Sequence, residues 1–169
     1  MDLSANKLGL LLLLLLTLVS SALKSEPPVS GLVTAIEDGD KLVIVTEDKQ
    51  RVKVRLKGID APENAQPFFR EAADNLRRLS LRKYAALEGT KIDRYGYLVA
   101  KVLIGNTDAC LEQIRAGYAW HFKRYESEQT EQDRKSYAQA EQEARKEKRG
   151  LWQAPTPEPP WTWQATNGH

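Results

Sequence analysis

Cysteine and histidine are scarce in this chain of 169 residues, which contains one cysteine, Cys110, and two histidines, His121 and His169. One cysteine cannot form an intramolecular disulfide, so the fold must rest on an ordinary hydrophobic core, in which we expect Cys110 to be buried. His121 is isolated and is expected to be structural. A metal site built from carboxylates alone would be an oxygen-only site, which suits a hard cation such as calcium or magnesium.

The chain also lacks a strong excess of positive or negative charge. It has 25 Lys and Arg residues and 23 Asp and Glu residues, which give a net charge of +2. Such a balance does not by itself indicate a polyanionic partner. The cations are instead clustered along the chain, in residues 51–57, 77–83 and 123–124. Each cluster alone is equally consistent with a solvated face and with a binding surface.

The apolar run Leu8–Val19 has twelve residues, which is short for a membrane span of about 20. Lys7 precedes it, and the small residues Ser20 and Ala22 allow cleavage after Ala22. This layout predicts a secretory signal peptide over residues 1–22, and hence a secreted or periplasmic protein with no stable membrane association after cleavage. The alternative is an uncleaved membrane anchor.

The rest of the chain divides into a linker, one domain and a tail. Residues 23–30 are predicted to be a linker, residues 31–153 a single domain, and residues 154–169 a tail rich in proline and tryptophan that packs on the domain. The prolines should keep the tail extended rather than helical. Trp161 and Trp163 should return to cover apolar surface.

Five strands are predicted from β-branched and aliphatic runs and from alternation at period two. The clearest covers residues 51–57, in which Val52, Val54 and Leu56 alternate with basic residues. This alternation directs the apolar side chains to a core and the basic ones to the opposite face. The five predicted strands are residues 32–36, 42–46, 51–57, 83–87 and 98–104.

Three helices are predicted, over residues 68–81, 108–116 and 131–149. Apolar residues at helical spacing define the first, Asp108 caps the second, and cations followed by Gly150 end the third. Five short strands with helices inserted and appended indicate an α+β fold: a five-stranded Greek-key β-barrel of the OB type with three helices. The open face of such a barrel is a common nucleic-acid surface.

The candidate site combines two short motifs. Residues 38–40 read Asp-Gly-Asp, and residues 55–63 read Arg-Leu-Lys-Gly-Ile-Asp-Ala-Pro-Glu. Together they place one cation, Arg55, within reach of three carboxylates, which are those of Asp40, Asp60 and Glu63. A metal beside an arginine and a spare carboxylate suits phosphodiester cleavage. The metal and the arginine neutralise charge on the phosphoryl oxygens, and the carboxylate takes a proton from water.

Each of these residues also has a simpler interpretation. Aspartates such as Asp40 are common in turns, and Asp60 can be a loop residue that bonds nearby backbone. Glu63 and Arg55 can be plain surface charges. Their joint occurrence at the ends of adjacent strands favours a shared site, because burying that many charges without a metal would be costly.

The two motifs and an ordered series of later segments resemble the thermonuclease (staphylococcal nuclease) family. The resemblance covers roughly residues 30–163. The matching segments are residues 33–40, 54–63, 66–68, 93–96, 116–120, 140–145, 150–152 and 160–163.

This resemblance implies an OB-type barrel with three helices and calcium-dependent cleavage of DNA and RNA. It further implies that Asp40, Asp60 and the backbone carbonyl of Ala61 bind calcium. Glu63 would be the general base for the attacking water. Arg55 would bind the scissile phosphate and stabilise the transition state.

One departure from the family pattern concerns Tyr97, which stands where the pattern usually has a second arginine. A tyrosine donates one neutral hydrogen bond and supplies no positive charge. The loss of one preorganised donor typically costs about 10²–10³ in rate. Arg94, three residues earlier, would compensate only from an irregular backbone.

Nucleic-acid contacts are expected from two tyrosines and two cations. Tyr95 and Tyr125 can stack on or hydrogen-bond a nucleotide, and Arg94 and Lys123 can meet phosphates. The alternative for both tyrosines is partial packing in the core with the hydroxyl at the surface.

Three functions follow from these observations. The first is a secreted or periplasmic calcium-dependent nuclease, a monomer that acts on flexible or single-stranded DNA and RNA with little sequence preference. The second is an OB-fold module that binds nucleic acid but cleaves it slowly or not at all. The retained carboxylates favour the enzyme, whereas Tyr97 favours the module. The third is an unrelated OB-fold carrier of an oligosaccharide or a protein.

Overall fold

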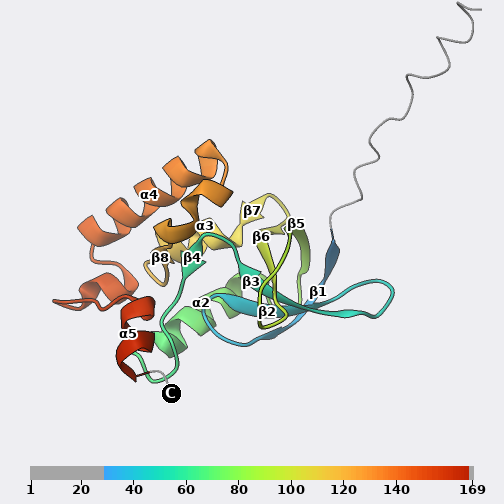
Figure 1. Cartoon of the computed structure of the whole chain (residues 1–169), viewed down its shortest axis with the longest axis horizontal. Coiled ribbons are helices and arrows are strands. Elements are labelled where there is room, and N and C mark those ends of the chain that lie inside the picture. Colours follow the sequence, from blue (N-terminus) through green and yellow to red (C-terminus); the bar gives the residue numbers. More distant parts are fainter. Residues whose placement is uncertain (1–28, 168–169) are drawn as a thin grey trace, which may run out of the picture.

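A computed structural model describes residues 29–167 of the chain, which Figure 1 shows in colour. The predicted signal peptide, residues 1–22, lies outside the described residues, as does all but the end of the predicted linker, residues 23–30. Within the described part, no helix is both long enough and apolar enough to cross a membrane.

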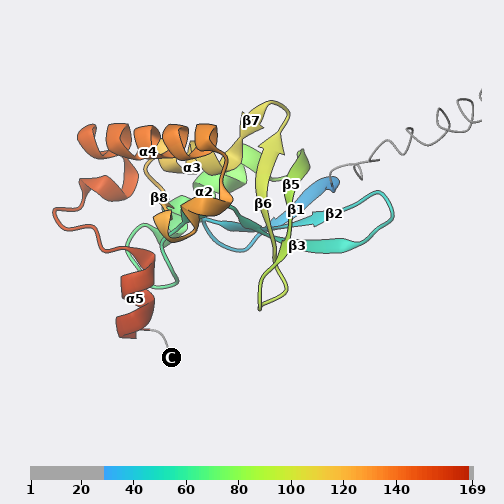
Figure 2. The same cartoon turned by 45° about the horizontal axis from the view of Figure 1, so that its top comes forward.

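Five strands close into a barrel, and the predicted α+β fold of the OB type is confirmed (Figures 1 and 2). These strands are β1 (Ser30–Ile36), β2 (Lys41–Val45), β3 (Arg51–Leu56), β5 (Tyr84–Ile92) and β6 (Leu98–Ile104). Neighbours in the order β3-β2-β1-β5-β6 are antiparallel. A parallel pairing of β3 with β6 then closes the ring.

The side chains of β3 show how the barrel is filled. Val54 and Leu56 are buried in the core, and Val52 is partly buried against it. Arg51 and Lys53 are exposed on the opposite face. The predicted orientation of this strand is therefore confirmed, and its basic face remains available to solvent.

Closing a small barrel requires sharp bends, which β-bulges supply in β1 and β5. In β5 the pairing with β6 shifts between Glu88 and Lys91. Gly89 lies in this bulge, and a side chain there would collide with the Val99 carbonyl. Because the bulge interrupts the alternation of side chains, the sequence predicts a shorter strand than the structure contains.

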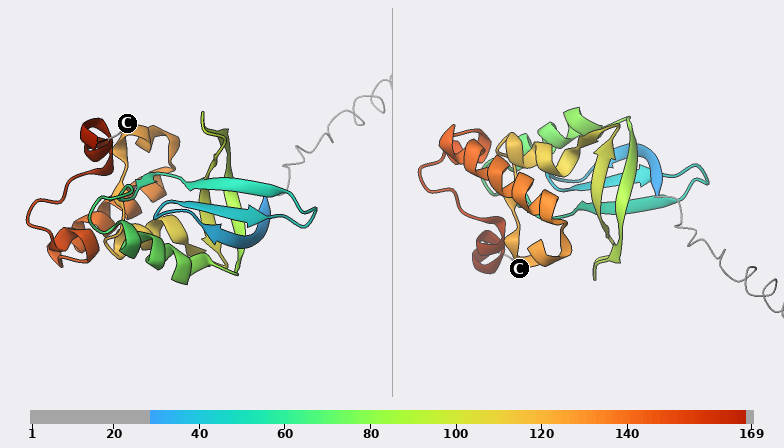
Figure 3. Two further views of the ribbon diagram at one scale, coloured as in Figure 1. Left: turned by 90° about the horizontal axis from the view of Figure 1, so that it is seen from below. Right: turned by 90° about the horizontal axis from the view of Figure 1, so that it is seen from above.

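Three helices lie on one side of the barrel (Figure 3). They are α2 (Phe69–Ser80), α3 (Ala109–Arg115) and α4 (Glu131–Lys146), and α3 contacts both of the others. All three were expected from the sequence, although α4 ends before the predicted residue 149. Backbone of positive φ at Lys148 and Gly150 follows the end of α4.

Asp108 links α3 to α4, in addition to its predicted role as a helix cap. Its Oδ1 accepts hydrogen bonds from the amides of Cys110 at 2.9 Å and Leu111 at 3.2 Å, as an N-cap should. Its Oδ2 accepts from the Tyr137 hydroxyl of α4 at 2.8 Å. Cys110 and Tyr137 are both buried, so this carboxylate fixes the contact between the two helices.

Several short elements are not predicted by the sequence patterns, because they are too short to show a period. Two of them, β4 (Ile59–Asp60) and β8 (Trp120–His121), pair antiparallel and bring Asp60 opposite Trp120. The others are β7 (Thr107–Asp108), which pairs with β6, and the 3-10 helices η1 (Lys123–Glu128) and η2 (Gly150–Gln153).

The C-terminal tail contains an additional helix. Residues 154–159 form no helix or strand, as their proline content predicts, but α5 (Pro160–Asn167) follows, so the prediction of an extended tail is wrong for these eight residues. Proline is tolerated at the first position of a helix, so the helix can begin there. The Trp161 ring centroid lies 5.6 Å from that of Trp120 and 5.2 Å from that of Phe122.

Asp108→Ala should destabilise the fold by about 2–4 kcal/mol, because it removes a helix cap and leaves the buried Tyr137 hydroxyl without its partner. Urea unfolding followed by circular dichroism measures the change. Asp74→Ala, which removes only an exposed ion pair with Arg77, is the control and should cost less than about 1 kcal/mol. Equal losses in the two variants would contradict the role of Asp108.

Candidate functional site

The Asp-Gly-Asp motif forms a tight turn that leads into β2. Asp38 Oδ1 accepts a hydrogen bond from the Asp40 amide at 3.0 Å. The Glu37 amide donates to the Lys41 carbonyl at 2.9 Å, which closes the turn. Asp40 is only 3% exposed, so its carboxylate is held in a defined position at the start of the strand.

Gly39 packs this turn against two other parts of the site. A side chain at Gly39 would come within 2.7 Å of the Cβ atoms of Ala61 and Ala72, so only glycine lets the turn approach them. The Gly39 carbonyl accepts from Gln113 Nε2 at 2.6 Å, and the same amide donates to the Ala72 carbonyl at 3.0 Å. Gln113 is fully buried. Sequence reasoning missed it, because a lone glutamine in a short helix gives no periodic signal.

The β2–β3 ladder brings the second motif to the same end of the barrel. The Leu56 amide donates to the Asp40 carbonyl at 2.8 Å, and Lys41 lies opposite Arg55 in the ladder. Asp60 follows in β4. The acidic turn, the arginine and the second aspartate are therefore positioned by backbone pairing rather than by flexible loops.

Burial and neighbouring charges act together on the two aspartates, Asp40 and Asp60. Burial and then the charge of Glu63 raise the pKa of Asp60 to about 7, against the opposing charges of Lys41 and Arg55. Burial also raises the pKa of Asp40 well above its ordinary value, and neighbouring carboxylates add to this rise. Asp60 thus lies within electrostatic reach of Asp40, Glu63 and Arg55.

Lys41 is a member of the cluster that sequence reasoning missed. Its Nζ lies 2.5 Å from Asp38 Oδ2 and 3.1 Å from Asp40 Oδ1. Burial disfavours its charge, but the two aspartates outweigh burial and raise its pKa above the ordinary value for lysine. The sequence offered one signal, the lysine directly after the Asp-Gly-Asp motif, which resembles any cation at the start of a strand.

Glu63 lies in the irregular loop between β4 and α2. Its amide donates to Gln66 Oε1 at 2.9 Å, and its Oε1 accepts a hydrogen bond from Gln164 of α5. The residue is partly exposed, so water can reach its carboxylate. Gln164 is a second member of the site that the sequence did not reveal.

Arg55 is held between an aspartate and the aromatic ring of Tyr97. Its Nε lies 3.6 Å from Asp93 Oδ2, and these two buried atoms have no hydrogen-bond partner among the described residues. Its guanidinium carbon lies 5.6 Å from the centre of the Tyr97 ring, and Lys53 Nζ lies 5.3 Å from the same ring. The Tyr97 hydroxyl donates to Glu37 Oε2 at 2.6 Å, and this bond raises the pKa of Tyr97 to about 12.

The four residues predicted to bind nucleic acid lie at the surface in two places. Arg94 and Tyr95 lie in the turn between β5 and β6, where the Arg94 Nη2 donates to the Tyr95 hydroxyl at 2.6 Å. Lys123 and Tyr125 lie in η1, and Lys123 Nζ is 3.8 Å from a carboxylate oxygen of Glu141. The two tyrosines are 59% and 47% exposed, so neither packs in the core.

The donor set of the cluster fits a hard divalent cation. Among residues 29–167, no group of three or more His, Cys, Asp or Glu side chains is arranged to hold a metal ion. The site predicted from the sequence is smaller than such a group, because it would use the carboxylates of Asp40 and Asp60 and the backbone carbonyl of Ala61. Four acidic side chains and two basic ones in this region give a formal charge of −2 when all are ionised, which a divalent cation would balance. The four acidic residues are Asp38, Asp40, Asp60 and Glu63, and the basic ones are Lys41 and Arg55.

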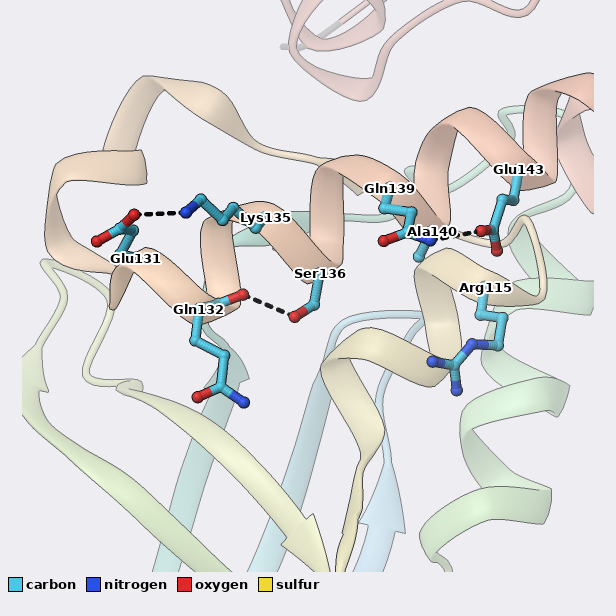
Figure 4. Close-up of a pocket in the computed structure, with 8 residues that line it drawn as sticks. All are labelled: Arg115, Glu131, Gln132, Lys135, Ser136, Gln139, Ala140 and Glu143. Carbon is cyan, nitrogen blue, oxygen red and sulfur yellow. Dashed lines mark hydrogen bonds and ion pairs between the residues drawn. The ribbon is translucent and has the colours of Figure 1, made fainter.

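A hollow of about 650 Å³ lies elsewhere, between α3 and α4 (Figure 4). Its polar side chains largely bond to one another or to nearby backbone: Lys135 pairs with Glu131 at 2.5 Å, and Gln139 donates to Glu143 at 2.9 Å. Because these groups are already satisfied and none belongs to the acidic cluster, size alone does not make this hollow the functional site.

Comparison with known proteins identifies relatives of this chain. The family model described as staphylococcal nuclease homologue matches residues 53–154. Proteins called uncharacterized endonuclease are 34% identical over 159 residues in Haemophilus influenzae and 31% identical over 137 residues in Escherichia coli. These alignments cover 94% and 80% of this chain, and 85% of each relative.

A longer relative occurs in rice, Oryza sativa subsp. japonica. It carries the name probable staphylococcal-like nuclease CAN3 and is 32% identical over 131 residues, which is 76% of this chain. The alignment covers 33% of the rice protein, so the chain spans about a third of the length of that relative.

Asp60→Asn should stabilise the metal-free protein at pH 8, by on the order of 2 kcal/mol, and change little at pH 4. Folding raises this pKa from 3.8 to about 7. The stability contributed by the protonated form is therefore fully present below the unfolded value and is lost as the pH rises through the folded one. Asparagine removes the charge that is unfavourable above that pH.

Urea unfolding in the presence of a chelator at the two pH values tests this prediction. Glu47→Gln, at an exposed position, is the control and should have little effect at either pH. An equal gain for Asp60→Asn at pH 4 and pH 8 would show that its carboxyl does not titrate as described.

Proposed function

This chain belongs to the staphylococcal nuclease family, and from that premise we propose that it is a calcium-dependent nuclease that hydrolyses phosphodiester bonds of DNA and RNA with little sequence preference. The observation that carries the proposal is that Asp60 lies within electrostatic reach of Arg55, Asp40 and Glu63 at one end of the barrel. The named relatives support a nuclease, and calcium accords with the oxygen donors of the cluster.

In this proposal Asp40, Asp60 and the Ala61 carbonyl hold the calcium ion. When bound, the ion neutralises charge on the phosphoryl oxygens and favours ionisation of water. Gly39 and Gln113 contribute indirectly, because they fix the turn that carries Asp40 against the loop that carries Ala61.

Glu63 acts as the general base. Its carboxylate is partly exposed, as a group that meets a water molecule must be. Arg55 binds the scissile phosphate and stabilises the charge that develops on its oxygens. Its side chain is one-third exposed, and its contact with Asp93 Oδ2 at 3.6 Å leaves guanidinium donors free for a phosphate.

Compared with an arginine at this position, Tyr97 weakens the phosphate site, but the site keeps positive charge from Arg55 and Lys53. The ring lies beside Arg55, which supports a place for position 97 next to the proposed phosphate, but its hydroxyl is neutral and already donates to Glu37. Lys53 lies over the same ring and keeps a second cation nearby. This exposed lysine favours phosphate binding through its charge alone, without the paired donors of an arginine.

The exposed tyrosines and cations suggest a flexible or single-stranded substrate. Bases that are not paired can stack on Tyr95 and Tyr125 while Arg94 and Lys123 meet the phosphates. A rigid duplex hides those base faces. We also propose that the protein acts as a monomer, and that residues 1–22 direct it to the periplasm or the exterior, without stable membrane association after their removal.

A binding module that cleaves poorly is the second candidate. Two observations favour it: Tyr97 supplies no positive charge, and Lys41 already neutralises part of the acidic pair Asp38 and Asp40. This module would bind nucleic acid through the same exposed tyrosines and cations.

The wild-type protein should degrade heat-denatured DNA in the presence of calcium and not in the presence of a chelator. Glu63→Gln should retain binding but lower the rate by about 10²–10⁴, because the amide cannot accept the proton. Gel electrophoresis measures the degradation, and fluorescence anisotropy with a labelled oligonucleotide measures the binding. Binding without degradation above the Glu63→Gln level would support the module and contradict the enzyme.

Tyr97→Arg should raise the rate of cleavage by at least about tenfold, because it adds a charged donor beside Arg55. Tyr84→Arg adds the same charge on an exposed part of β5 and is the matched control. Initial rates on a single-stranded oligonucleotide compare the variants. Equal rates for Tyr97→Arg and the control would show that position 97 does not meet the phosphate.

A further inference from the structure

We propose that Gln164, in the C-terminal helix α5, is a positioning residue for Glu63, so that the tail helps to orient the general base of the site. This inference rests on the proposed function, because it assigns the tail a role in the action of the general base. Figures 1 and 2 show α5 beside the loop that joins β4 to α2, in which Glu63 lies. Nothing in the spacing of the two sequence motifs points to a residue so near the end of the chain.

Two glutamines tie the tail to this loop. Gln164 Nε2 donates a hydrogen bond to Glu63 Oε1. The Glu63 amide donates to Gln66 Oε1 at 2.9 Å, and Gln66 Nε2 donates to the Glu158 carbonyl at 2.7 Å. Gln66 is buried, with 6% of its surface exposed. The backbone and the carboxylate of Glu63 are therefore both connected to the tail, through separate bonds.

The helix that carries Gln164 is itself anchored to the site. Trp161 packs against Trp120 and Phe122, with ring centroids 5.6 Å and 5.2 Å apart. Trp120 lies opposite Asp60 in the β4–β8 pair and packs on Trp152 at 4.3 Å. The donor of the hydrogen bond is thus fixed relative to the same strand pair that carries Asp60.

Glu63 needs such support because it lies in a loop rather than in a strand. A free glutamate side chain samples many rotamers, and a general base works only within hydrogen-bond reach of the proton that it accepts. The Gln164 amide engages one carboxylate oxygen and leaves the other free to accept the proton from water. The amide donates only a hydrogen bond and gives up no proton.

The same contact admits an opposite reading, in which α5 masks Glu63 and lowers activity. The geometry favours positioning, because one amide satisfies one of the two oxygens and the residue stays partly exposed. The two readings predict opposite changes in rate when the donor is removed, so one variant distinguishes them.

Gln164→Met keeps the size of the side chain and removes the donor, and it should lower kcat roughly tenfold with KM changed less than about twofold. Gln164→Arg keeps an N–H donor and should retain most of the wild-type kcat. Gln153→Met makes the same substitution at an exposed position of η2 and should leave kcat unchanged. An unchanged or increased kcat in Gln164→Met would overturn the proposal.

A double variant separates positioning from general support of the fold. If Gln164 acts through the Glu63 carboxylate, Gln164→Met should cause no further loss of kcat in a Glu63→Gln background. A further tenfold loss there would mean that the residue acts by another route, and would overturn the proposal.

Hydrogen exchange tests the contact without relying on turnover. Amides of residues 160–167 should exchange faster in Gln164→Met than in the wild type or Gln153→Met, because α5 loses one of its attachments. Equal exchange rates in Gln164→Met, Gln153→Met and the wild type would show that the Gln164–Glu63 contact does not hold α5 in place, and would overturn the proposal. If the wild type degrades no nucleic acid, the proposed function fails and the catalytic role of Gln164 fails with it, while the exchange result still decides whether the tail is held at Glu63.

Discussion

The crowding of like charges at one end of the barrel is the constraint on which the site depends. Burial and then neighbouring carboxylates raise the pKa values of Asp40 and Asp60, although Lys41 opposes the rise at both residues and Arg55 opposes it at Asp60. Flexible side chains would relieve this repulsion by moving apart. Here the Leu56 amide bonds the Asp40 carbonyl, and β4 is paired with β8, so the backbone resists separation. A site that keeps buried carboxylates together, with Lys41 and Arg55 neutralising only part of their charge, is prepared for a cation, and this need connects the fold to the proposed chemistry.

The supporting residues come from parts of the chain far from the two motifs. Gln113 of α3 holds the acidic turn, Asp93 from the β5–β6 turn faces Arg55, and Gln164 of α5 reaches Glu63. Each acts on a different member of the cluster, and each belongs to a different structural element. The barrel thus supplies the strand ends, and the elements outside it set the orientation of the side chains that those ends carry. A substitution in the tail should consequently change the orientation of Glu63 at the site.

The sequence predicted what depends on a repeating pattern or a local motif. The alternation around Val54 predicted β3 and its two faces, and Asp108 predicted the start of α3, because both signals arise from neighbouring residues. The β4–β8 pair and α5 gave no such signal, one being too short and the other following a proline-rich segment. Lys41 and Gln164 were missed for a related reason. Their importance arises from a tertiary contact, and neither residue type marks a site on its own.

Calcium binding measured by isothermal titration calorimetry tests most directly whether the cluster is a cation site. The account predicts one calcium ion per chain, with affinity reduced at least about tenfold by Asp40→Asn and by Asp60→Asn. The same substitution at the exposed Asp74 should leave affinity unchanged. Absence of binding at millimolar calcium, or binding that survives both changes in the cluster, would contradict the account.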